Sequence, residues 1–143
     1  MNDERFAAYL STSIVDHDGR IWAGPGALAE LPVLAPVYVI TAHNPGTDVL
    51  SDADNLARNQ ELARAVNELN PASVTEVIGR ADTGNPSWEE ASLAVAGIAE
   101  ADIARLAERF GQWAYFELTD TEQRVVAVET LVQHLGTMRP RRS

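Results

Sequence analysis

The chain has 143 residues, a length typical of one domain. It carries 21 acidic and 11 basic residues, giving a formal net charge of -10, and it contains neither cysteine nor lysine. These absences exclude disulfide frameworks, thiol catalysis, Schiff-base lysines and the lysine of phosphate-binding loops. The acidity is unfavourable for general nucleic-acid binding, which depends on neutralising phosphates, so we expect no nucleic-acid partner.

The N-terminal residues 1–5 are polar, and no apolar run after them is long enough for a signal peptide or a membrane span. We therefore expect a soluble cytoplasmic protein with no membrane partner. The basic residues at 139–143 predict a disordered tail. Residues 1–138 are then expected to form one domain, with its core at 36–118.

Turn signals and apolar runs alternate along the chain, as they do in a mixed α+β domain. Asp18-Gly19 suits a tight hairpin turn, and Ser51 is a good helix N-cap. The run at 37–42 is apolar on both faces, which is typical of a central strand. The expected elements are a hairpin at 9–23, one or two helical turns at 27–31, strands at 37–42, 74–78, 91–98, 113–118 and 123–128, and helices at 52–69, 99–110 and 128–135.

Residues 36–118 give the order β-α-β-β-α-β, which is the ferredoxin-like split βαβ. The expected fold class is therefore α+β, with a ferredoxin-like core, an added N-terminal β-hairpin and a C-terminal strand and helix. In that arrangement the strands at 37–42 and 91–98 are central neighbours. Helices cover only one face of such a sheet, so the second face needs the N-terminal hairpin, the C-terminal segment or another subunit.

The same arrangement brings the loops at 41–51, 79–90 and 111–113 to one end of the sheet, where binding sites are commonly built. Two carboxylates, Glu89 and Glu90, precede a central strand, and strand alternation sends one to each face. A carboxylate at this end could act as a general acid or base. A solvated strand entrance is the simpler interpretation.

Two amides lie on the inward side of the helix expected at 52–69. Its apolar stripe ends at Leu69 and, extended backward at helical spacing, carries Asn59 and Asn55. A buried amide must find hydrogen-bond partners. The two side chains therefore either brace the backbone of the loop at 41–47 or line a pocket, and the brace is the commoner arrangement.

Several short motifs occur in a fixed order along the chain. They are Thr41-Ala42-His43-Asn44-Pro45, then Ser51 with Asn55 and Asn59, then Trp88-Glu89, and finally Phe110-Gly111-Gln112. In this order and spacing they resemble the bacterial family catalogued as domain of unknown function 3293 (DUF3293), over residues 10–118. The resemblance implies a shared fold and residue set. It implies no reaction or cofactor, because that family has no assigned activity.

The charged and aromatic residues of this edge admit more than one role. Arg80 could bind a carboxylate or phosphate, or pair with Asp82 or Glu89. Trp88 could stack on a planar ligand or cover the core. Three aspartates, Asp48, Asp52 and Asp54, crowd the start of the helix, which argues against an anion there. The three histidines have no metal-ligand spacing, so we expect no metal and no cofactor.

Three functions remain open for this edge. The first is the binding of a small polar molecule, neutral or cationic, by Thr41, Asn44, Asn55, Asn59, Arg80, Trp88 and Gln112. The second is an enzyme that uses Glu89 as general acid or base. The third is a non-catalytic interaction module, or a homodimer that packs through the sheet face, in which the polar side chains only brace loops.

Overall fold

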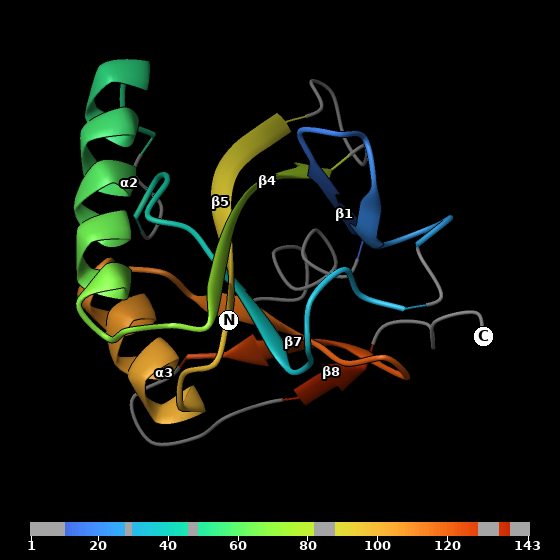
Figure 1. Ribbon diagram of the computed structural model, residues 1–143. Coiled ribbons are helices and arrows are strands. Elements are labelled where there is room, and N and C mark those ends of the chain that lie inside the picture. The colour runs from blue at the N-terminus through green and yellow to red at the C-terminus, as the bar shows by residue number, and fades with distance from the viewer. Residues whose placement is uncertain (1–10, 28–29, 46–48, 82–87, 129–134, 138–143) are drawn as a thin grey trace.

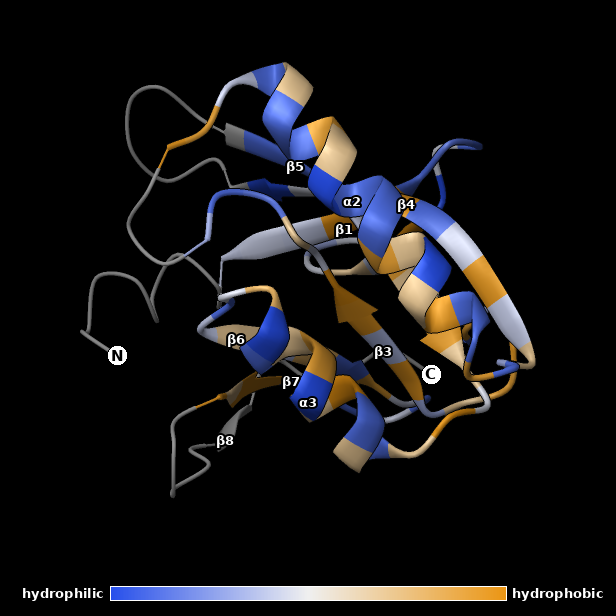
Figure 2. Ribbon diagram, turned by 90° about the vertical axis from the view of Figure 1, so that its left-hand side faces the viewer, coloured by the Kyte–Doolittle hydropathy of each residue, from blue (hydrophilic) through white to orange (hydrophobic). Residues whose placement is uncertain are grey.

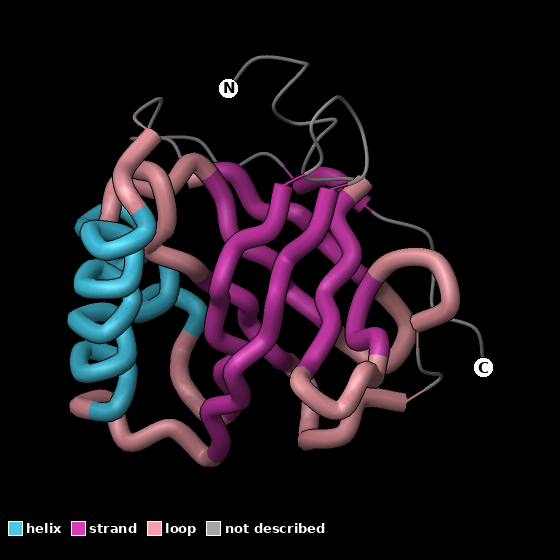
Figure 3. Tube along the Cα trace, turned by 90° about the horizontal axis from the view of Figure 1, so that it is seen from above, coloured by secondary structure: helices cyan, strands magenta, loops and turns pink. Residues whose placement is uncertain are grey.

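The computed structural model describes residues 11–27, 30–45, 49–81, 88–128 and 135–137. Within these residues, eight strands form a single antiparallel sheet. Two helices lie on the same side of that sheet (Figure 1 and Figure 3). The α+β class expected from the sequence is therefore confirmed.

The described elements follow one another in a regular order along the chain. They are β1 (Thr12–Asp16), β2 (Ile21–Ala23), β3 (Val37–Ile40), α2 (Asp52–Asn67), β4 (Ser73–Ala81), β5 (Trp88–Ala96), α3 (Glu100–Arg109), β6 (Ala114–Leu118), β7 (Gln123–Ala127) and β8 (Leu135–Thr137).

The sheet is larger than the four strands of the predicted core. Its order is β2-β1-β4-β5-β3-β6-β7-β8, so β3 and β5 are neighbours, as predicted. The hairpin β1–β2 pairs with the outer edge of β4, and β7 and β8 extend the sheet beyond β6. The ferredoxin-like description was too small because β4 and β6 would otherwise be unpaired edges, which the terminal segments cover.

The chain itself covers the second face of β3. Val37 and Val39 point to that face and pack in one cluster with Trp22, Leu31 and Phe116. The sheet can cover itself because it curls, which brings its two ends together (Figure 1). Of the three covers that the sequence left open, the N-terminal hairpin with the segment after it supplies much of this one.

A hydrogen bond between the two ends of the sheet holds the curl. The backbone N–H of Gly24, just after β2, donates to Gln123 Oε1 at the start of β7, over 3.0 Å. Gly24 has a φ of +99°, and a Cβ there would lie 2.6 Å from Ser13 Oγ. Only glycine fits this close approach in this backbone conformation.

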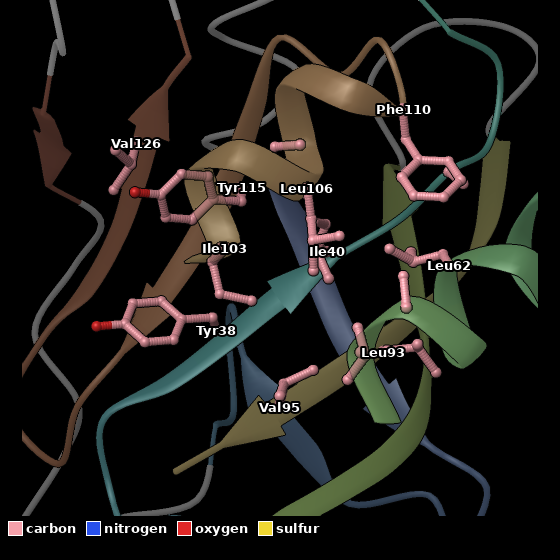
Figure 4. Packing of buried hydrophobic residues seen from close by; sticks show 14 residues of the cluster. Tyr38, Ile40, Leu62, Leu93, Val95, Ile103, Leu106, Phe110, Tyr115 and Val126 are labelled. Atoms are coloured by element: carbon pink, nitrogen blue, oxygen red, sulfur yellow. The ribbon is translucent and has the colours of Figure 1, made fainter. Parts of the chain in front are cut away.

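The helices cover the other face of β3. Tyr38 and Ile40 point to this side, where Leu62 of α2 and Ile103 of α3 pack on them (Figure 4). Seen from the helix side, the outer turns of α2 are largely hydrophilic, and the strand beneath is hydrophobic (Figure 2). All four residues of β3 are buried as a result, as the apolar run predicted.

The local helix signal at Ser51 is confirmed. The Oγ of Ser51 accepts a hydrogen bond from the N–H of Asp54 over 3.1 Å, so Ser51 caps α2 as predicted. The helix ends earlier than expected, at Asn67. Leu69 therefore lies beyond the helix and is 36% exposed, and its predicted place on the buried stripe was wrong.

The predicted last helix is also corrected in part. Residues 129–134 lie outside the described residues, but Leu135 and Gly136 belong to strand β8. They pair with Val126 and Val125, because the free edge of β7 offers unpaired backbone groups. Residues 28–29 of the predicted turns at 27–31, and the predicted tail at 139–143, lie outside the described residues as well.

One buried carboxylate organises the turn of the hairpin β1–β2. Asp16 accepts hydrogen bonds from the indole N–H of Trp22 and from the Nε of Arg20, each over 2.8 Å. It also accepts from the backbone N–H groups of Asp18 and Arg20. Burial opposes ionisation, but the hydrogen bonds and the charge of Arg20 outweigh it and lower the pKa of Asp16 from 3.8 to about 2.

We expect Asp16→Asn to destabilise the fold by about 1–3 kcal/mol, since an amide cannot accept all of these hydrogen bonds. Asp18→Asn is the control, because the side chain of Asp18 is 79% exposed. It should change stability by less than about 0.5 kcal/mol. Urea denaturation measures both.

The stabilisation from Asp16 should be complete above the ordinary pKa of 3.8 and be lost as the pH falls towards 2. A wild-type protein and an Asp16→Asn variant that lose stability in parallel over this pH range would contradict the assignment.

Candidate functional site

The segment that leaves β3, Thr41 to Asn44, is held by side chains from three other places in the chain. We call this segment the β3 loop. The side-chain oxygen of Asn55, on α2, accepts from the N–H of Asn44, and its amide nitrogen donates to Asn44 Oδ1, both over 2.9 Å. Asn44 in turn accepts from the N–H of Leu50 over 2.9 Å. This reciprocal pair holds Asn44 at a φ of +43°, a region that asparagine tolerates better than most residues.

Two further amides bind the β3 loop. The oxygen of Asn59 accepts from the N–H of Ala42 over 2.9 Å. The amide nitrogen of Gln112 donates to the carbonyl of His43 over 3.1 Å and to that of Phe110 over 3.3 Å. The amides that the sequence singled out therefore do converge on one loop. Each of the three makes a hydrogen bond to its backbone.

The sequence did not single out Arg58, which is the fourth member of this brace. Its Nε donates to the carbonyl of Ala42 over 2.7 Å, and its Nη2 donates to the carbonyl of Phe110 at the end of α3. The guanidinium also lies 5.7 Å from the centre of the Phe110 ring. Its place one residue before Asn59 suggested only an exposed pair with Asp54. The forked donor set was the overlooked signal.

His43 lies half-buried within the brace. Its Nε2 is 3.5 Å from the amide nitrogen of Asn55. Burial lowers the pKa of His43 from its ordinary 6.5, and the negative charge of Asp52 opposes this effect. The neutral imidazole is therefore the form that the folded protein favours.

Thr41 faces the opposite side of the sheet from the amides. Its hydroxyl donates to the carbonyl of Ala91 over 2.7 Å and accepts from the N–H of His43 over 3.1 Å. On that side lies a small cavity of about 20 Å³, partly open at the end of the sheet. It is lined by Thr12, Ile14, Val39, Ile40, Thr41, Gly79, Glu90, Ser92, Ala114 and Phe116.

The structure separates the two neighbouring carboxylates. Glu89 pairs with Arg80 across β4 and β5, over 2.6 Å between Nε and Oε2, and both side chains are about half exposed or more. Glu90 is half-buried and lines the cavity. The expected alternation is confirmed, but the carboxylate beside the cavity is Glu90 rather than the candidate Glu89. The sequence could not choose between them, because either strand face could have been the inner one.

Strand pairing also explains why Arg80 does not join the amides. The sequence placed residues 79–90 in a loop, whereas β4 continues to Ala81 and β5 begins at Trp88. Arg80 and Glu89 are partners in this ladder. The backbone of Trp88 pairs with Ala81, while its side chain, like Asp48 and Asp82, lies outside what the structure describes.

The described part of the chain offers no metal centre and no membrane anchor of the helical kind. It contains no group of three or more histidine, cysteine, aspartate or glutamate side chains that could hold a metal ion. None of its described helices is both long enough and apolar enough to cross a membrane.

Comparison with known families gives one match. Residues 40–115, more than half of the chain, match the family described as "Protein of unknown function (DUF3293)". The chain belongs to the DUF3293 family. Comparison with curated proteins and with solved structures finds no match.

The matched region of this DUF3293 chain contains the whole brace. It begins at the last residue of β3 and ends within β6, so it includes the β3 loop, α2 and Gln112. It also includes Glu90 and Ser92 of the cavity, whereas Thr12 and Ile14 lie before it.

Removal of the central amide should loosen the loop. We expect Asn55→Ala to cost about 1–3 kcal/mol of unfolding free energy, since it leaves the N–H and side-chain oxygen of Asn44 without their partner. Gln60→Ala removes an exposed amide from the same helix and should change stability by less than about 0.5 kcal/mol. Urea denaturation of both variants measures the difference, and equal effects would contradict the brace.

His43 should make the stability of the protein depend on pH. Because the folded state lowers the pKa of His43, its contribution is complete above 6.5 and is lost as the pH falls below that value. We expect His43→Gln to remove this part of the dependence. Urea denaturation at several pH values between about 8 and 5 measures it, and an unchanged slope in the variant would contradict the assignment.

Proposed function

We propose that this DUF3293 protein binds a small polar molecule, neutral or cationic, in the cavity at the end of β3. The observation that carries the proposal is the cavity itself. It combines the hydroxyl residues Thr12, Thr41 and Ser92 with one carboxylate residue, Glu90, on otherwise apolar walls. A few polar groups in an apolar hollow are the usual composition of a ligand site.

The amide brace has a supporting part in this proposal. Of the residues expected to contact a ligand, Thr41 lines the cavity. Asn44, Asn55, Asn59 and Gln112 bind the β3 loop instead, on the other side of the sheet. They hold the backbone that carries Thr41, and a rigid support of this kind fixes the geometry of a site before ligand arrives.

The charge of the chain favours a neutral or cationic ligand. The net charge is -10, and Glu90 is the charged residue among those that line the cavity. The described cation nearest to Glu90 in sequence, Arg80, is paired with Glu89. An anion would therefore meet a negative field with no counter-charge.

The two other functions that the sequence left open have less support. Glu89 is exposed and ion-paired, which is a weak basis for acid–base catalysis. The inner sheet face, proposed for a homodimer, is packed with the chain's own Trp22 and Leu31. Binding is thus the function that the geometry favours.

A cavity-filling variant tests the proposal. A Cβ on Gly79 would lie 3.6 Å from the Cγ2 of Thr12 and 3.7 Å from the Cδ1 of Ile14, which are ordinary contacts, so Gly79→Ala should fold. It would occupy part of a cavity with room for about one water molecule. Ala91→Val is the control, because it adds bulk to an exposed position of β5 outside the cavity lining.

The measurement is a titration with small amines, amides and alcohols, followed by the backbone amide signals in NMR. We expect shifts at residues 12–14, 39–41, 79 and 90–92. The response should weaken at least about tenfold in Gly79→Ala and persist in Ala91→Val. Titrations that leave these signals unchanged, or that affect both variants equally, would overturn the proposal.

A further inference from the structure

We infer that the group entering the cavity is a primary ammonium on a short alkyl chain, with the carboxylate of Glu90 as its counter-charge. The inference rests on the proposed function and names its ligand class. It follows from three properties of the cavity: its size, the direction of its hydrogen bonds and its walls.

The size of the cavity limits what can enter. A volume of about 20 Å³ has room for a group the size of one water molecule. An ammonium group is of this size, whereas a planar guanidinium carries three nitrogens on one carbon and is too large. The rest of the ligand would remain at the mouth.

Two hydroxyls of the cavity have already used their hydrogens. The hydroxyl of Thr41 donates to the carbonyl of Ala91 over 2.7 Å. The hydroxyl of Ser92 donates to the carbonyl of Glu90, over a longer 3.4 Å. Each oxygen then offers lone pairs, and one of those on Thr41 accepts from the N–H of His43. Toward a ligand, these two side chains are acceptors.

A cavity of acceptors selects a ligand that only donates. An ammonium group has three donors and no acceptor, and a carboxylate has only acceptors. The residues that line the cavity include no arginine, histidine, asparagine or glutamine that could donate to an anion. The hydrogen-bond pattern and the charge of Glu90 therefore point to the same ligand.

The apolar walls fit the carbon next to the ammonium. Ile14, Val39 and Phe116 line the cavity beside the polar residues. Contact with these side chains would bury a methylene or two and add about 0.8 kcal/mol for each one. A short alkylammonium combines such carbons with a small cationic head.

The test compares three probes of similar size and different charge: ethylammonium chloride, ethanol and sodium acetate. Each is titrated into the full chain at constant ionic strength and near neutral pH, with the amide signals at 12–14, 79 and 90–92 as readout. We expect ethylammonium to bind at least about tenfold more tightly than ethanol, because charged hydrogen bonds are the stronger kind. Acetate should give no saturable shift.

Two neighbouring variants then locate the charge. Glu90→Gln keeps the shape of the side chain and should abolish the preference of ethylammonium over ethanol. Glu89→Gln is the matched control, since Glu89 lies on the opposite face and pairs with Arg80, and it should keep the preference. Well-dispersed NMR spectra of both variants confirm that they are folded.

The outcomes separate the inference from the proposed function. If ethanol and ethylammonium bind equally and Gly79→Ala weakens both, the cavity binds polar molecules but the ammonium inference is wrong. If Glu89→Gln, rather than Glu90→Gln, removes the preference, the counter-charge lies on the outer face and the inference is also wrong. If acetate binds in place of ethylammonium, or if no probe shifts the cavity signals, both the inference and the proposed function fail.

Discussion

The burial of β3 on both faces is the constraint on which the rest of this structure depends. All four of its residues are buried, and β5 and β6 pair with its two edges. Each face then needs its own apolar cover. The two helices cover one face, and the sheet curls to cover the other with its own N-terminal hairpin and the strands beyond β6. The size and curl of the sheet follow from this need.

The same constraint explains why polar side chains gather where β3 ends. The β3 loop leaves the core before it reaches solvent, so its backbone groups need partners inside the protein. Asn55, Asn59, Gln112 and Arg58 supply them from α2 and from the end of α3. This brace is structural in the first place. On the other face of the same strand end, the curl leaves the small cavity with its hydroxyl and carboxylate residues.

The brace and the cavity meet at Thr41. Its backbone belongs to the braced loop, and its side chain lines the cavity and donates to β5. A change in the brace would therefore move a wall of the cavity. This coupling gives the amide set a place in binding without contact to a ligand, and it connects both parts of the region that the DUF3293 family shares.

The sequence by itself determined the local features: the hairpin turn at Asp18-Gly19, the Ser51 cap, the doubly apolar β3 and the inward amides of α2. These depend on neighbours within a few residues, so periodicity and capping rules reveal them. Only the tertiary structure decided which of Glu89 and Glu90 faces inward, how far β4 and β5 extend, and that Arg58 binds two carbonyls. Such outcomes depend on pairing and curvature between segments distant in the chain. Inner and outer faces exist only once the sheet has closed on itself.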